Sequence, residues 1–373
     1  MTKRKYIYIL VLLAVCLPVL LSCSDDSETE NALVKVEVIP CAPSFVEVSP
    51  ITTRAWNPPA GYYLYNDEYV NGPYIEQANL INNTIGVFFT QDGSSAPKVG
   101  SFFYDDSDEK WRSTVEINSG TYYLYGFIPY ESGVSPSISG TFSTGATLTL
   151  QNMPTVTPSD VCVVVGAKNG NSPEDDNGLT TAQFEYVTEG TTNHVFLLFD
   201  HLYSALNLKV RVAADYYKLR RIKLKEMKLK PYNDEAASSD KTTVTVTLAS
   251  NSLKSSPITE VSYTPVGTGG NPMPVYQSED GIDLGTDYTP IRCCFTPGGI
   301  TKFILVSKYD VYDRKGNLIR KDCTAENVIN MSLFSETTQM ERGRIYTLYL
   351  TVEPTYLYVL SDPDLDNPTL VID

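Results

Sequence analysis

Apolar and polar residues alternate along much of this chain with a period of two, the spacing of a β-strand that buries one face. In the first such segment Val34, Val36 and Val38 fall on one side, whereas Lys35 and Glu37 fall on the other. We therefore expect a half-buried strand in this segment.

Similar runs recur along the rest of the chain, separated by Gly, Pro, Asn and Asp residues that favour turns. The expected strands are residues 45–48, 85–90, 111–117, 121–130, 147–150, 161–166, 195–212, 242–249, 261–264, 291–295, 302–312 and 345–352, and Lys315-Gly316-Asn317 is the expected turn of a hairpin. Helical periodicity nowhere extends much beyond about three turns. The pattern predicts an all-β fold in which less than about a tenth of the residues are helical.

Residues 195–212 form the clearest candidate for a core strand, because apolar side chains dominate this run while polar ones alternate outward at its end. The residues expected to point inward are Phe199, Leu206, Leu208 and Val210.

The first 22 residues have the features of a secretory leader. Lys3-Arg4-Lys5 is followed by an apolar stretch that Pro18 interrupts and that is too short to favour a membrane-spanning helix. The stretch ends Leu20-Leu21-Ser22-Cys23, which looks like a bacterial lipoprotein cleavage site. We interpret residues 1–22 as a lipoprotein signal peptide and Cys23 as the lipid-bearing residue. An uncleaved signal anchor with a chance cysteine is the alternative.

The charge of the chain argues against some partners. Three of the 29 Lys and Arg residues lie in the leader, which leaves 26 against 44 Asp and Glu, a formal net charge of −18. So acidic a chain is a poor candidate for binding nucleic acid or an anionic membrane. The basic run 218–230 could bind an anion, but lysines on a solvent face or an edge strand explain it better.

Residues that could support chemistry are sparse. Five cysteines follow Cys23 without CxxC spacing, which indicates free thiols rather than a disulfide framework or a zinc site, although one pair stays open. The two histidines, His194 and His201, lie in or beside the core strand. The Asp362, Asp364 and Asp366 run resembles a calcium loop but lacks its glycine and distal glutamate, which favours a charged terminal turn. We expect no enzymatic activity, no metal and no cofactor.

Aromatic residues leave a second function open. The chain has 26 tyrosines, and Trp56 and Trp111 would form a glycan-stacking surface if they lay coplanar with tyrosines on an exposed face. The alternative function is therefore an outer-membrane surface lipoprotein that binds glycans.

Several stretches, taken in order, resemble the fimbrillin family of Bacteroidetes lipoproteins, the subunits of type V pili. The matching stretches span most of the chain after the leader: Leu20–Cys23, Thr53-Arg54-Ala55, Ile85–Phe88, Trp111, Gly120–Pro129, Phe199-x-His201-Leu202-x-x-Ala205-Leu206-x-Leu208-x-Val210 and Arg342-Gly343-x-x-Tyr346-x-Leu348-x-Leu350-x-Val352. The resemblance implies two transthyretin-like β-sandwich domains in tandem. We expect residues 23–190 to form the first domain and residues 191–373 the second.

The resemblance also implies a mechanism of assembly. In the family an N-terminal strand fills a groove until a surface protease cuts after an arginine, and a strand from another subunit then takes its place. Here the removable segment would be residues 23–54, containing the strand 32–38 alone or together with 45–48, and Arg54-Ala55 would be the scissile bond for an arginine-specific surface protease. The incoming strand would be 356–360 or 369–372 of another pilin subunit. Until cleavage, the lipid on Cys23 would hold the chain at the surface of the outer membrane, and the cut chain would join a fimbrium.

Overall fold

The computed structural model describes the chain in stretches separated by gaps. The described residues are 36–41, 46–48, 84–91, 97–105, 110–113, 117, 120–169, 185–187, 193–232, 239–250, 258–267, 269–334, 338–356 and 363–373.

Strands make up nearly all of the regular structure in these stretches. The helices among the described residues are the short α4 (Ala214–Tyr217) and the single 3-10 turn η2 (Met331–Leu333). Neither is long and apolar enough to cross a membrane, and the same holds throughout the part of the chain that the structure describes. The prediction of an all-β fold is therefore confirmed.

The largest sheet has eight strands and closes on itself. Its order is β10 (Glu185–Val187), β6 (Gly120–Ile128), β3 (Ile85–Thr90), β4 (Lys98–Asp105), β5 (Lys110–Ser113), β1 (Val36–Cys41), β11 (Asn193–His201) and β9 (Cys162–Asn169). The closure comes from β9, which also pairs with β6 at Phe127 and Ile128. Every strand from β6 round to β9 therefore has a hydrogen-bonded neighbour on both sides.

A four-stranded sheet lies beside this closed sheet and joins distant parts of the sequence. Its order is β15 (Ile258–Pro265), β14 (Lys241–Leu248), β8 (Gly145–Pro154) and β7 (Ser135–Thr141). Because β14 pairs with β8, residues on both sides of position 190 share one sheet. The division into domains 23–190 and 191–373 stays a prediction.

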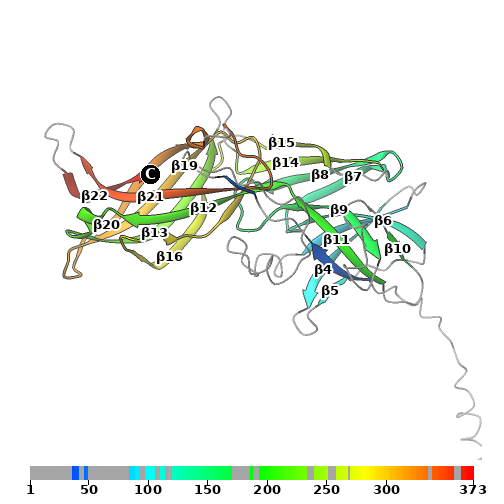
Figure 1. Ribbon diagram of the computed structural model, residues 1–373, viewed down its shortest axis with the longest axis horizontal. Coiled ribbons are helices and arrows are strands. Elements are labelled where there is room, and N and C mark those ends of the chain that lie inside the picture. The colour runs from blue at the N-terminus through cyan, green and yellow to red at the C-terminus, as the bar shows by residue number, and fades with distance from the viewer. Residues whose placement is uncertain are drawn as a thin grey trace, which may run out of the picture.

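Two further sheets form the other end of the molecule (Figure 1). The six-stranded sheet consists of β17 (Thr289–Pro290), β12 (Tyr203–Val212), β21 (Arg344–Tyr356) and β2 (Val46–Val48), with β18 (Cys294–Pro297) on β12 and β22 (Pro363–Ile372) on β21. The four-stranded sheet has the order β16 (Met273–Leu284), β13 (Arg221–Tyr232), β19 (Lys302–Tyr312) and β20 (Leu318–Asn330). The predicted hairpin turn at Lys315–Asn317 joins β19 to β20, where the Asp313 carboxylate accepts hydrogen bonds from the amides of Lys315 and Asn317.

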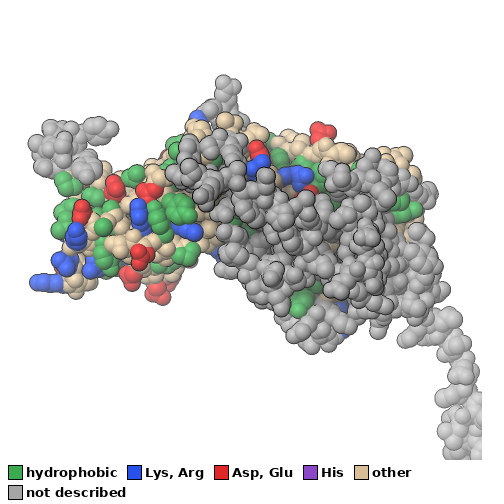
Figure 2. All heavy atoms as spheres, in the orientation of Figure 1, with side chains coloured by type: hydrophobic (Ala, Val, Ile, Leu, Met, Phe, Trp, Pro, Cys, Tyr) green, Lys and Arg blue, Asp and Glu red, His purple; other side chains and the backbone are tan. Residues whose placement is uncertain are grey.

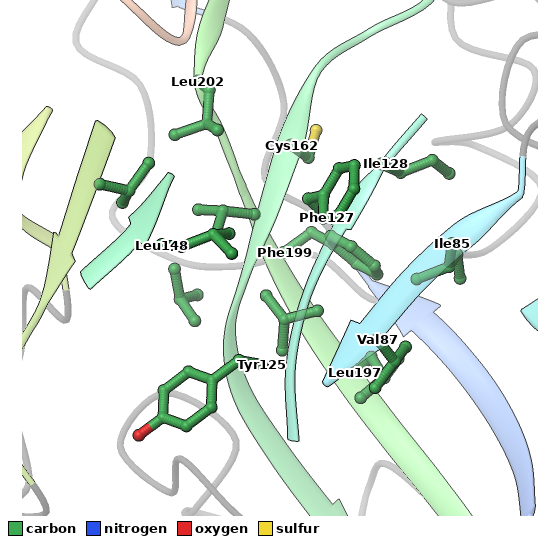
Figure 3. Packing of buried hydrophobic residues seen from close by; sticks show 14 of the residues in the cluster. Ile85, Val87, Tyr125, Phe127, Ile128, Leu148, Cys162, Leu197, Phe199 and Leu202 are labelled. Carbon is green, nitrogen blue, oxygen red and sulfur yellow. The ribbon is translucent and has the colours of Figure 1, made fainter. Parts of the chain in front are cut away.

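Two hydrophobic clusters fill the space between the sheets. The first, part of which Figure 3 shows, includes Ile85, Phe127, Leu148, Cys162, Leu197, Phe199 and Leu202. The second lies between the six-stranded sheet and β13, β16, β19 and β20, and it includes Leu208, Leu224, Phe303, Leu305, Tyr346 and Leu350. Alternate apolar side chains supply both clusters, as the period of two predicts.

The predicted core strand 195–212 is wrong in one respect, because the structure divides it into β11 and β12. The amides of Leu202 and Tyr203 both point to the carbonyl oxygen of Val161, at N···O distances of 2.7 and 3.3 Å. The chain bends there and passes from the closed sheet into the six-stranded sheet. The predicted inward residues are nevertheless all buried, with Leu206, Leu208 and Val210 at 0% exposure and Phe199 at 3%.

The basic run 218–230 lies largely in β13, which has strands on both sides and is not an edge strand. Within β13 the apolar residues Ile222, Leu224, Met227 and Leu229 are buried, and the lysines are half-buried, whereas Lys218 before the strand is exposed. Lys228 pairs with Glu226 at 2.7 Å. Figure 2 shows Lys and Arg side chains interspersed with Asp and Glu over this end of the molecule, so the visible face carries no field of a single sign.

Candidate functional site: the edges that the N-terminal strands cover

Strand β1, which lies in the segment 23–54, is an internal strand of the closed sheet. Six of its residues pair in parallel with β11, from Val36 opposite Asn193 to Cys41 opposite Leu198. On its other side Glu37 and Val38 pair antiparallel with Arg112 and Trp111 of β5. Because the backbone of β1 serves both neighbours, β1 completes the ring of strands.

The register places two positions of β1 opposite buried residues of its neighbours. Val38 stands opposite Trp111, which is buried at 3% exposure. Pro40, two positions on, stands opposite Leu197, which is fully buried.

Strands β2 and β22 share one edge of β21. Residues 345–352 of β21 pair with β12 along the first edge. The second edge pairs with β2 at residues 344–346 and with β22 at residues 350–356. The N-terminal segment and the C-terminal strand thus approach each other end to end along this edge.

Polar contacts fasten both ends of β22. At one end the Asp366 carboxylate accepts hydrogen bonds from Nε and Nη2 of Arg220, at 3.0 and 2.8 Å. At the other end the Asp373 carboxylate pairs with Arg211 at 2.9 Å and accepts hydrogen bonds from Thr351 and Tyr288. Burial and the hydrogen bond to Asp373 raise the pKa of the Tyr288 hydroxyl. We call these two groups of contacts the β22 clasp.

Apolar contacts add to the clasp. Leu370 is buried and Ile372 packs against the second hydrophobic cluster, whereas Val371 between them is exposed. The predicted donor segment 369–372 therefore lies in an edge strand with alternating burial. The predicted charged turn around Asp364 and Asp366 is wrong, because both residues belong to β22.

A separate polar cluster lies buried where β9 begins and β11 ends. Nδ1 of His201 is 2.8 Å from Oδ2 of Asp160, and the Cys162 thiol lies 3.1 Å from the same oxygen and 3.4 Å from the imidazole nitrogen. Burial and the neighbouring Asp160 carboxylate raise the pKa of the Cys162 thiol well above its usual value. Next to the cluster, Arg342 binds the Asp200 carboxylate at 2.9 Å and the carbonyl oxygen of His201 at 3.0 Å.

Sequence reasoning did not find this cluster, because 39 positions separate Cys162 from His201. The signal that could have indicated it is the two-residue spacing of Asp160 and Cys162 at the start of a strand, which puts both side chains on one face. Cys162, Cys294 and Cys323, which are buried among the described residues, carry free thiols.

The predicted lipidation and cleavage residues, Cys23, Arg54 and Ala55, lie outside the described residues, as does the donor alternative 357–360. The described parts of the segment 23–54 are β1 and β2. The structure thus describes the two strands that the predicted cut would detach, together with the edges they cover.

Comparisons with known proteins give similarities at the level of solved structures. No family model matches the chain, and no curated protein does. A fimbrial protein from Bacteroides vulgatus is similar at 13% identity and a TM-score of 0.38, over 80% of this chain and 94% of that one. The fimbrial anchor protein Mfa2 from Porphyromonas gingivalis is similar at 11% identity and a TM-score of 0.26, over 90% and 95%. A fimbrial protein from Bacteroides ovatus is similar at 10% identity and a TM-score of 0.29, over 86% of this chain and 49% of that one. Because these scores and identities are low, the proposals below rest on the residues and strand pairing of this chain.

Proposed function

We propose that this protein is a structural or accessory subunit of a cell-surface pilus, assembled by protease-triggered strand replacement. The observation that carries the proposal is the position of β1 between β5 and β11 in the closed sheet. This strand belongs to the segment before Arg54, so a cut at Arg54-Ala55 leaves it held by non-covalent contacts alone. The fimbrillin resemblance in the sequence points to the same segment.

Loss of β1 would expose two strand edges at once. β11 would lose backbone partners along six positions and β5 along two, and unpaired backbone groups away from water cost free energy. The core side of the slot, next to Trp111 and Leu197, would also open to water. Such a slot is a site for strand addition by an extended segment with alternating apolar residues.

The C-terminal strand supplies a segment of that kind. In β22, Leu370 and Ile372 pack against the second hydrophobic cluster and Val371 is exposed. The two-residue spacing of Leu370 and Ile372 is also the spacing of Val36 and Val38 in the sequence of β1. We propose that residues 369–372 of one subunit, released from β21, enter the slot of the next subunit. The segment 356–360 is the alternative donor.

The lipid on Cys23 completes the proposed cycle. It would hold the uncut chain at the outer membrane, and cleavage after Arg54 would free the subunit from its anchor while opening the slot. An irreversible cut gives the assembly a direction that reversible strand exchange lacks. The partners are therefore other pilin subunits and an arginine-specific surface protease.

Treatment of the full-length chain with an arginine-specific protease tests this proposal. We expect Ala55 as the new N-terminus, followed by multimers that resist SDS. Arg54→Ala should stay uncut, monomeric and bound to lipid, whereas Arg314→Ala, in the exposed turn after β19, should behave as the wild type. A cut chain that stays monomeric at high concentration would contradict a role as a polymerising subunit.

The structure argues against one of the two tryptophans that the glycan-binding alternative would use. Trp111 is buried at 3% exposure and packs edge-on against Tyr104, with 5.7 Å between ring centroids, so its face is not available to a sugar. Trp56 lies outside the described residues. A pull-down on insoluble glycans separates the two functions, because a pilus subunit should not be retained.

A further inference from the structure

We propose that Asp160, Cys162 and His201 form a binding site for a divalent transition-metal ion, and that Zn²⁺ is the ion that suits it. His201 lies in β11, three positions beyond Leu198, where the pairing with β1 ends, but the metal site does not depend on the proposed role in a pilus. Its three donor atoms, a carboxylate oxygen, a thiol sulfur and an imidazole nitrogen, all lie within 4.8 Å of one another.

Strand pairing brings the three residues together. Asp160 and Cys162 are two positions apart, so their side chains point to one side of the chain as it enters β9. Cys162 stands directly opposite His201 in the pairing of β9 with β11, which puts the imidazole on that same side. All three residues are at most 1% exposed, and Figure 3 shows Cys162 beside Phe127 and Ile128 of the hydrophobic cluster.

The hydrogen bonds of the cluster leave one acceptor unused. Oδ2 of Asp160 accepts a hydrogen bond from the Cys162 thiol and lies 2.8 Å from Nδ1 of His201. Oδ1 of the same carboxylate is buried and has no hydrogen-bond partner. A buried carboxylate oxygen without a partner is costly, and an ion is one of the recognised explanations for such an orphan. A cation between the three side chains would give Oδ1 a ligand role.

The charges of such a site would balance. Binding breaks the S–H bond of Cys162, forms a metal–sulfur bond and releases the proton to solvent. His201 binds as the neutral tautomer with its proton on Nε2, which leaves the lone pair of Nδ1 for the metal. The thiolate and the Asp160 carboxylate together carry two negative charges, which a divalent cation neutralises. A neutral centre suits a position that is almost completely shielded from water, where an uncompensated charge is expensive.

The identity of the donors selects the metal. Thiolate and imidazole ligands favour Zn²⁺ over Ca²⁺ and Mg²⁺, which prefer oxygen. With Zn²⁺–ligand distances of about 2.0–2.3 Å, tetrahedral donors lie roughly 3.3–3.6 Å apart. The observed separations of 2.8, 3.1 and 3.4 Å would therefore grow by only a few tenths of an ångström on binding. Because Oδ1 and Oδ2 belong to one carboxylate, Oδ1 would make Asp160 a bidentate ligand and would not occupy a separate tetrahedral position.

The position of the site indicates a structural role. It ties the start of β9 to the bend at which the chain leaves β11 for β12. Arg342, just before β21, also binds the last residues ahead of this bend, because its Nη1 donates hydrogen bonds to the Asp200 carboxylate and to the carbonyl oxygen of His201. A metal here would stabilise the passage between the closed sheet and the six-stranded sheet.

Metal content of the purified full-length protein tests the proposal. After incubation with Zn²⁺ and removal of free ion, we expect about one Zn²⁺ per chain, the stoichiometry of a single site. With Co²⁺ in its place, we expect the absorption band of a cobalt–thiolate bond. Added Zn²⁺ should also raise the Tm, because the ion binds the folded chain. Cys162→Ser and Asp160→Asn should each lose the retained metal and the Tm shift, and Cys162→Ser should also lose the band.

Cys323→Ser is the matched control, because Cys323 is also a buried, hydrogen-bonded thiol but lies in the second hydrophobic cluster. It should keep the metal and the band. Far-UV circular dichroism shows whether each variant folds. If Cys162→Ser fails to fold, a chain that combines Cys41→Ser, Cys293→Ser, Cys294→Ser and Cys323→Ser tests the proposal instead. In this chain Cys162 is the only cysteine besides Cys23 and the leader's Cys16, so it should still retain Zn²⁺ and show the cobalt–thiolate band. The loss of both would contradict the proposal. A wild-type chain that retains no Zn²⁺ and shows no cobalt–thiolate band overturns the proposal, as does a folded Cys162→Ser chain that retains both.

Discussion

The backbone amide of Asp373 donates a hydrogen bond of 3.0 Å to the carbonyl oxygen of Tyr349 in the middle of β21. Val48 pairs with Tyr346, three positions earlier on the same edge of that strand. The N-terminal segment and the C-terminal strand therefore converge on one short stretch of backbone. Detaching β2 would leave an unpaired stretch of the β21 edge next to the end of β22. In the proposed assembly, release of the N-terminal segment would therefore change the surroundings of the C-terminal strand.

Cys23→Ala should abolish anchoring. Without the thiol that we propose carries the acyl chains, the protein should no longer partition into detergent or incorporate a palmitate analogue, because a lipid anchor derives its affinity from buried methylene groups. Cys41→Ala, a cysteine of β1, is the control and should be labelled normally. Unchanged labelling of Cys23→Ala would show that the lipoprotein interpretation is wrong.

Leu208→Ala should destabilise the fold by about 2–5 kcal/mol, since it removes a fully buried side chain and leaves a cavity in the second hydrophobic cluster. Urea unfolding followed by circular dichroism measures the change. Leu318→Ala removes the same atoms from a side chain that is 49% exposed, so it should change stability by no more than about 0.5 kcal/mol. Equal losses for both variants would contradict the assigned core.

Loosening the β22 clasp should speed assembly of the cut chain. Arg211→Met combined with Arg220→Met removes the ion pairs to Asp373 and Asp366, and each partly exposed pair contributes about 0–1 kcal/mol. The rate of SDS-resistant multimer formation should rise while the Tm changes little. Lys218→Met, which removes an exposed pair with Asp215 outside the clasp, should leave the rate unaltered. A slower rate in the double variant would argue that β22 is not the donor.

The sequence predicted the strands where one face of the sheet is buried and the other is not. Residues 242–248 alternate between threonine and an apolar residue after Thr242, and the structure has β14 there. The bend at Leu202 could not be predicted, because the residues on both sides of it are mostly apolar and give one continuous pattern. The residues before and after the bend are nevertheless buried in different parts of the core. Those before it pack in the closed sheet and most of those after it pack in the second cluster.

The pairing of strands that are distant in the sequence could not be predicted from local patterns of apolar and polar residues either. The run 32–38 indicated a strand, but not that its described part, β1, would lie between β5 and β11. The meeting of Asp160 and Cys162 with His201 likewise depends on the register of β9 and β11. The period of apolar residues and the positions of turn residues indicate where a single strand lies. The register, in contrast, depends on how two strands pair.

The most direct test of strand replacement is to lock β1 in its slot. Val38 and Val195 are register partners in adjacent strands. Neighbouring strands lie about 4.7–4.9 Å apart, which is within the Cα separation of disulfides, so Val38→Cys combined with Val195→Cys should join β1 covalently to β11. After cleavage by the arginine-specific protease, this oxidised chain should stay monomeric in SDS gels, and a reductant should restore multimers to the level of the Val38→Cys single variant. Multimers that form equally well while the disulfide is intact would contradict the claim that β1 must leave before another subunit can enter.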